Sequence, residues 1–153
     1  MHGFLAAAMI ATMLLVPGAA AAEEAKAGSI AVKDAWSRAT PEGADVAVGY
    51  LTITNSGDAP DRLLSASAAF AGQTEIHQMT MAHGVMRMRP VTEGVPIPAK
   101  GTVVLAPDSY HLMFMGFKEA LQKGGTFLGS LTFEHAGKVG VTFHVQAMGA
   151  ASP

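Results

Sequence analysis

The sequence predicts an all-β fold, a single domain that forms an antiparallel β-sandwich or barrel. Short apolar or alternating runs recur through residues 23–153, and Gly, Pro, Asn, Asp and Ser separate them. No long stretch shows a convincing 3.6-residue period, so signals for helices are scarce. Eight or nine short strands at regular spacing in about 130 residues are typical of a sandwich or barrel.

The expected strands follow one another with turn residues between them. The clearest covers 46–55, which is rich in β-branched and aromatic residues and is followed by the turn Ser56-Gly57-Asp58. Residues 90–101 hold three prolines and two glycines, which predicts a loop with at most a short edge strand. Residues 118–125 are polar and could form a short helical turn. The other strands are expected at 29–38, 61–68, 74–81, 85–89, 102–105, 110–117, 127–133 and 139–147.

The first residues have the order of a secretory signal. An apolar run, Phe4–Val16, is followed by Pro17-Gly18 and by the small residues Ala19–Ala22. The run is shorter than the roughly 20 residues that span a bilayer. We therefore expect a signal peptide at 1–22 and a β-sandwich domain at 23–153, with no membrane insertion once the signal is cleaved. The alternative is a segment retained uncleaved as an anchor.

Composition excludes several classes of function. The formal net charge is −2 with scattered Lys and Arg, which argues against binding to nucleic acid or to an anionic membrane surface. There are no cysteines, so neither disulfides nor a blue-copper thiolate is available. No G-x-S-x-G, H-E-x-x-H or convincing carboxylate pair is present, so we do not expect an enzyme.

Histidine and methionine gather in one part of the chain. Of the seven methionines after residue 22, six lie between Met79 and Met115, and His77, His83 and His111 lie in or beside the same stretch. Thioether sulfur is soft and selects Cu(I), and imidazole suits copper in either oxidation state. The alternative interpretation is ordinary packing, since methionine often fills gaps in cores.

Alternation along strands sharpens the metal hypothesis. In the run 110–115, His111, Met113 and Met115 share one face, whereas Leu112 and Phe114 occupy the other, a natural core face. Donors two residues apart on a strand are about 6.5–7 Å apart, so their side chains can converge on one ion. Two further pairs share a face in the same way, Met86 with Met88 and His77 with Met79.

The spacing of these residues resembles a known signature. His77, ten residues, Met88, twenty-two residues and His111-Leu112-Met113 are similar to the motif of the PCu(A)C family of periplasmic copper chaperones, with a second gap one residue longer than usual. The extra residue falls in the 90–101 loop, where an insertion costs little. Other runs typical of the family are 36–38, 49–53, 84–91 and 110–116.

The resemblance implies a cupredoxin-like or immunoglobulin-like sandwich with one Cu(I) site formed by His77, Met88, His111 and Met113. It implies a periplasmic, monomeric copper chaperone that delivers Cu(I) by ligand exchange toward the Cu(A) centre of cytochrome c oxidase, or to another periplasmic copper protein. A copper-buffering or resistance protein that never donates its ion would use the same ligands and stays open. So does weak binding of Cu(II). Three more methionines are secondary donors, an apolar docking rim or simple packing (Met79, Met81 and Met86).

Overall fold

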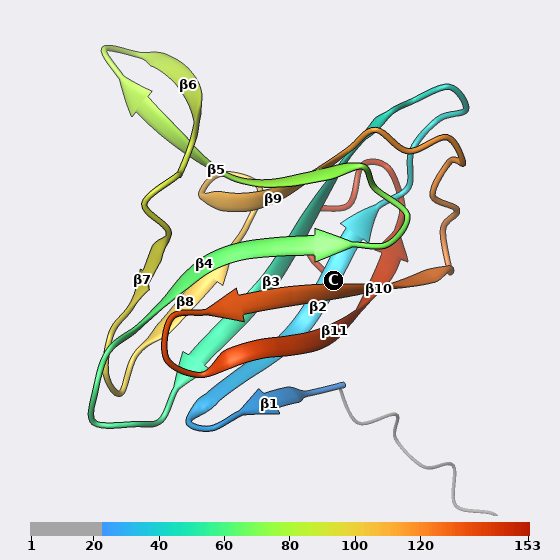
Figure 1. The fold of residues 1–153 in the computed structure, drawn as a ribbon. Helices are drawn as coiled ribbons and strands as arrows, with labels where there is room; N and C mark the ends of the chain where they lie inside the picture. Colours follow the sequence, from blue (N-terminus) through green and yellow to red (C-terminus); the bar gives the residue numbers. More distant parts are fainter. Residues whose placement is uncertain (1–22) are drawn as a thin grey trace, which may run out of the picture.

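The computed structural model describes residues 23–153, so the expected signal peptide at 1–22 lies outside the described residues. These residues form strands and no helix (Figure 1). Among them, no helix has the length and apolar character needed to cross a membrane. The strands are β1 (Ala25–Ala27), β2 (Ile30–Arg38), β3 (Val46–Asn55), β4 (Asp61–Ala68), β5 (Gln73–Ala82), β6 (Val85–Pro90), β7 (Val95–Ile97), β8 (Thr102–Leu105), β9 (Tyr110–Met115), β10 (Thr126–Phe133) and β11 (Gly137–Gln146).

The strands form one continuous hydrogen-bonded order, β6-β5-β9-β3-β2-β11-β10-β4-β7, with β1 paired to β2 and β8 to β3. All described pairs are antiparallel except β11 with β2, which run parallel and place His144 beside Trp36. The sheet folds over so that β4 also packs against β5 (Figure 1). The all-β expectation is confirmed, and the parallel pair joins the first long strand to the last.

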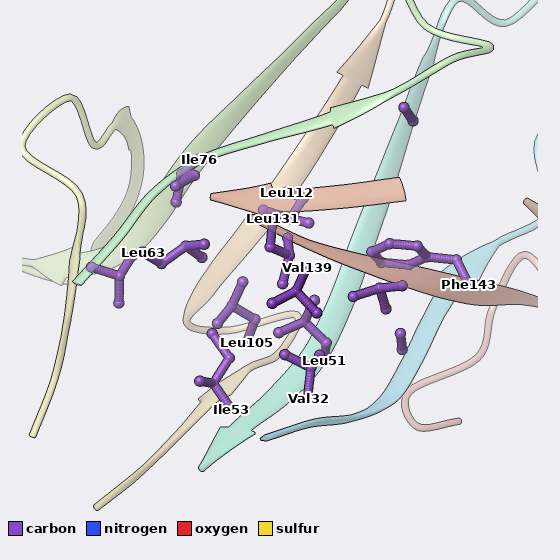
Figure 2. Packing of buried hydrophobic residues seen from close by; sticks show 14 of the residues in the cluster. Val32, Leu51, Ile53, Leu63, Ile76, Leu105, Leu112, Leu131, Val139 and Phe143 are labelled. Carbon is purple, nitrogen blue, oxygen red and sulfur yellow. The ribbon is translucent and has the colours of Figure 1, made fainter. Parts of the chain in front are cut away.

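A single hydrophobic core lies between the two halves of the folded sheet (Figure 2). Leu112 and Phe114 of β9 and Ile76 of β5 point into it, as the alternation predicted for β9. Removing such side chains from water stabilises the fold by roughly 1.5–3 kcal/mol each. The inward residues of β5 and β9 thereby fix which of their residues face outward. The largest fully buried side chains are Phe114, Phe133, Phe143, Ile30, Leu51, Ile53, Leu63, Ile97, Leu105, Leu112, Leu131 and Val32.

Gly49 of β3 lies opposite Leu112 and leaves space for an aromatic ring. A Cβ at position 49 would be 2.6 Å from the ring of Phe114, closer than any real contact. That ring packs edge-on against Phe143 with centroids 5.6 Å apart. The missing side chain at Gly49 is thus part of the core packing that holds β9 in place.

Most expected strands are confirmed, three of them with identical bounds (46–55, 61–68 and 102–105). The differences lie at the ends. Gly116 has φ of 73°, which ends β9 two residues before the predicted end. Residues 118–125 form turns rather than a helical turn. The short strand β1 was not expected, and β7 is the edge strand allowed within the 90–101 loop.

A two-residue turn joins β5 to β6. His83 and Gly84 have φ of 51° and 74°, the positive values that a type I′ turn requires at both central positions. Ala82 and Val85 flank the turn as the first pair of the ladder. The turn therefore sets the register in which every residue of β6 faces β5.

Candidate metal centre

The two histidines of the predicted motif face each other on neighbouring strands. His77 of β5 and His111 of β9 are direct cross-strand partners, so both side chains leave the same face of the sheet. Their ring centroids are 6.0 Å apart. His111 is 4% exposed, and the His77 side chain is 12% exposed. The next pair in the ladder, Ile76 with Leu112, points into the core, which anchors the two histidines.

Met88 of β6 reaches this pair from the neighbouring strand. Its Sδ lies 3.3 Å from Nε2 of His111. Met88 is nevertheless 50% exposed, because β6 is the edge strand of the sheet and all its residues are exposed. A soft sulfur donor and an imidazole nitrogen therefore meet at a point that solvent can reach.

Met113 lies on the same face, two residues beyond His111. In the ladder it faces Glu75 of β5 on one side and Val48 of β3 on the other, and it is half-buried. It is a diagonal neighbour of His77, within reach of a long side chain. A direct contact joins His111 to Met88, and the strand register places His77 and Met113 beside His111 on the same face.

Hydrogen bonds select the tautomer of His111. Its Nδ1 lies 3.3 Å from the carbonyl oxygen of Ser109, which can only accept, so Nδ1 carries the proton. In the neutral ring this leaves the lone pair on Nε2, the nitrogen beside Met88 Sδ. The nitrogen nearest the sulfur is thus free to bind a metal.

His77 has a complementary arrangement. Its Nε2 lies 2.7 Å from Oε2 of Glu75, and an ionised carboxylate can only accept, so Nε2 donates. Its Nδ1 is buried without a hydrogen-bond partner among the described residues. A buried lone pair without a partner is costly, and metal ligation would satisfy it. The other Glu75 oxygen accepts from the Gln73 amide at 2.5 Å.

The surroundings of His111 favour its neutral form. Burial lowers the pKa of His111, the nearby His77 lowers it further, and the Ser109 carbonyl partly opposes both. Metal binding requires neutral imidazole, so a lowered pKa keeps His111 competent into mild acid.

No group of three or more His, Asp or Glu side chains converges anywhere within residues 23–153. Beside the two histidines, further donor side chains on this face include the thioethers of Met88 and Met113, which are soft ligands. The other three histidines within residues 23–153 lie elsewhere: His83 is exposed in the turn, His135 lies 3.9 Å from Glu134, and His144 lies 3.5 Å from Glu23.

Glu75 is the residue that sequence reasoning missed. It precedes His77 by two positions, as His77 precedes Met79, so all three share one face of β5. The two-residue spacing predicts that Glu75 lies beside His77, but carboxylates are common on exposed strand faces. Only the contact with Nε2 of His77 distinguishes Glu75 from other surface carboxylates.

The fold and these donors define a small β-sandwich protein with paired imidazoles and thioethers at the edge of its sheet. Residues 30–145 match the family model described as "Putative lipoprotein LpqE-like", and the chain belongs to this LpqE-like family. The family is part of the PCuAC clan, so the predicted resemblance is confirmed at that level. The chain is 30% identical over 118 residues to Putative lipoprotein Lxx21020 of Leifsonia xyli subsp. xyli, covering 77% of this chain and 70% of that protein.

Solved structures agree with this assignment. The copper-bound PCuAC domain from PmoF2 has a TM-score of 0.70 at 27% identity, covering 82% of this chain and 98% of that domain. The apo PCuAC domain from PmoF1 has a TM-score of 0.69 at 28% identity, covering 82% and 99%. CuI-DR1885 from Deinococcus radiodurans has a TM-score of 0.59 at 29% identity, covering 83% and 81%.

Proposed function

We propose that this protein is a periplasmic copper chaperone that binds one Cu(I) through His77, Met88, His111 and Met113 and delivers it by ligand exchange. The observation that supports it most directly is the 3.3 Å approach of Met88 Sδ to the unprotonated Nε2 of His111, with His77 directly opposite. The similarity to a copper-bound PCuAC domain and to CuI-DR1885 supports copper as the ion.

The donor set suits Cu(I) in particular. Two neutral imidazoles and two thioethers add no charge, so the loaded centre carries only the single positive charge of Cu(I). Thioethers also favour the softer oxidation state of copper. The carboxylate of Glu75 lies just outside this set, bonded to His77 rather than facing the ion as a hard ligand. Ag(I) is expected to bind as a mimic of Cu(I).

Exposure of one ligand supports transfer rather than storage. Met88 is 50% exposed on an edge strand, whereas His111 is 4% exposed. In the proposed exchange a partner's donor replaces Met88 first, since it is the ligand that solvent and partners reach. The two imidazoles, held by Ser109 and Glu75, release the ion last.

The proposed setting is the cell envelope. We propose that residues 1–22 are a cleaved signal peptide, that 23–153 act as a monomeric binding domain without enzymatic activity, and that the recipient is the Cu(A) centre of cytochrome c oxidase. The lipoprotein descriptions of its family and of its relative in Leifsonia xyli support an exported protein.

Two measurements test this proposal. X-ray absorption at the copper edge of the Cu(I)-loaded protein is expected to show two nitrogen and two sulfur scatterers, with one sulfur lost in each of Met88→Leu and Met113→Leu. Transfer to an apo Cu(A) domain is then followed by the appearance of that centre's spectrum after oxidation. A copper-loaded protein that never loads the acceptor would instead be a buffer.

A further inference from the structure

The hairpin of β5 and β6 carries four methionines in two directly opposed pairs. Met81 faces Met86 and Met79 faces Met88 in the ladder. Ala82 and Val85, which flank the two-residue turn, form a hydrogen-bonded pair, so the alternation of an antiparallel ladder makes both methionine pairs non-hydrogen-bonded. In such pairs the Cα atoms are only about 4.5 Å apart and the side chains lie close together.

The two methionine pairs continue the face that carries the histidines. Alternation along β5 places Met81 and Met79 on the side of His77. The pairs are two residues apart, about 6.5–7 Å along the strands. The inner pair already reaches the metal centre, since Met88 Sδ lies 3.3 Å from His111 Nε2. A row of sulfur donors therefore leads from the tip of the hairpin to the proposed centre.

These sulfurs are exposed to solvent rather than buried. Met81 is 67% exposed and Met86 is 52% exposed. No methionine occurs among the buried hydrophobic residues of 23–153, whose core is built from Ala, Val, Leu, Ile and aromatic side chains. Gap filling, the usual role of methionine in a protein, therefore does not account for these two.

We propose that Met81 and Met86 form a second, thioether-only site for a soft monovalent cation, Cu(I) or Ag(I), at the tip of the hairpin. The site binds the ion more weakly than the His and Met centre because it lacks imidazole. Its place in the row of sulfurs makes it the point at which an ion enters or leaves, through Met79 and Met88. That transfer role rests on the proposed function, whereas binding at the tip does not.

A purely apolar docking surface would need no sulfur. Leucine or isoleucine would bury more strictly apolar area, and both are abundant in the core of this chain. The residues nearest the turn on this face are instead the paired thioethers of Met81 and Met86, in continuous register with Met88, one of the two sulfur ligands proposed for copper. Soft-metal affinity explains both the choice of methionine and its pairing.

The test is an Ag(I) titration of the protein labelled with 13C at the methionine ε-methyl groups, followed by NMR. We expect the Met88 and Met113 methyls to shift with the first equivalent and the Met81 and Met86 methyls to shift together with a second, weaker one. Met148, which is 60% exposed on the C-terminal tail, is the matched control and is expected to stay unshifted.

The double variant Met81→Leu/Met86→Leu keeps the size and apolar character of both exposed side chains, so the fold is expected to persist. It should lose the second binding event, weakening it by tenfold or more, and keep the first. Met81 and Met86 methyls that respond no more than Met148, or a double variant that still binds two ions, would overturn the proposal. A response at Met81 and Met86 without one at Met113 would instead contradict the proposed function and leave the hairpin site standing.

Discussion

The carboxylate of Glu75 accepts a hydrogen bond from Nε2 of His77 at 2.7 Å, and the other ring nitrogen is left buried without a partner among the described residues. The hydrogen bond occupies Nε2, so Nδ1 is the nitrogen of His77 that can bind a metal. The Ser109 carbonyl fixes the tautomer and orientation of the His111 ring in the same way, by accepting from Nδ1. Both imidazoles are therefore oriented by bonds that exist before any ion arrives.

Replacing Glu75 should weaken copper binding through His77. Glu75→Leu removes the acceptor, so we expect a loss of Cu(I) affinity of about tenfold or more, as for other groups that orient metal-bound histidines. Glu75→Gln keeps an amide oxygen that can accept from Nε2 and should retain most of the affinity. Competition with a chromophoric Cu(I) chelator measures both.

The nitrogen spectrum of the metal-free protein separates this role from a merely structural one. The 15N shifts of His77 should show a protonated Nε2 in the wild type and in Glu75→Gln, and a mixture of tautomers in Glu75→Leu. Identical tautomer populations in all three proteins would show that Glu75 does not orient the ring. Glu119→Gln, at an exposed position outside the strands, is the control.

The stability of the metal-free protein should fall on mild acidification. Burial lowers the pKa of His111 in the folded state, with a further contribution from His77. The unfolded chain, with an ordinary His pKa of about 6.5, then binds more protons than the folded protein below that pH. The free energy of unfolding therefore decreases as the pH falls through about 6.5 and levels off below the lowered pKa.

Urea unfolding between pH 7.5 and 5 measures this effect, and His111→Gln is expected to flatten the profile. Equal slopes in the variant and the wild type would assign the pH dependence to other groups. Cu(I) binding opposes the loss, since it requires neutral imidazoles and stabilises only the folded state.

The effects of replacing Met88 and Met113, the two proposed sulfur ligands, should differ from the effect of replacing Met115 on β9. Met88→Leu and Met113→Leu are each expected to weaken Cu(I) binding by tenfold or more, about 1.4 kcal/mol. Met115→Leu is the matched control, because Met115 shares the face of Met113 but lies at the far end of the strand, opposite Val46 and Gln73. A loss in Met115→Leu as large as in Met113→Leu would mean that the donor set is wrongly assigned.

The packing of Gly49 against Phe114 should be visible in stability. A Cβ at position 49 would lie 2.6 Å from the Phe114 ring, so Gly49→Ala is expected to cost about 1–3 kcal/mol, the usual range for overpacking. Phe114→Leu in the same protein should recover part of that cost by making room. Additive effects in denaturant unfolding would show that the two residues do not conflict.

The strands and their faces could be predicted from sequence because alternation is local. The run 110–115 predicts Leu112 and Phe114 on the core face and His111 and Met113 on the opposite face, and the core confirms the first pair. The motif spacing brings together His77, Met88 and His111, which the structure confirms as neighbours. Whether they and Met113 bind copper stays a prediction.

Other features depend on contacts that no local pattern encodes. The parallel pairing of β11 with β2, in which His144 lies beside Trp36, follows from how the whole sheet folds over. The sequence around His144 does not predict that pairing. The contact between Glu75 and His77 depends on side-chain rotamers on one face of β5. The pairing of Met81 with Met86 depends on the two-residue turn at His83 and Gly84, whose type the sequence alone did not define.

The proposed copper chaperone depends on a Cu(I) site that contains thioether ligands. A competition titration against a calibrated Cu(I) chelator, on residues 23–153 and on the same protein with Met113→Ala, tests it most directly. We expect a tight complex at the His and Met centre that binds one ion and weakens by tenfold or more in the variant. No binding above the chelator background, or equal affinity in both proteins, would contradict it and assign the methionines to packing alone.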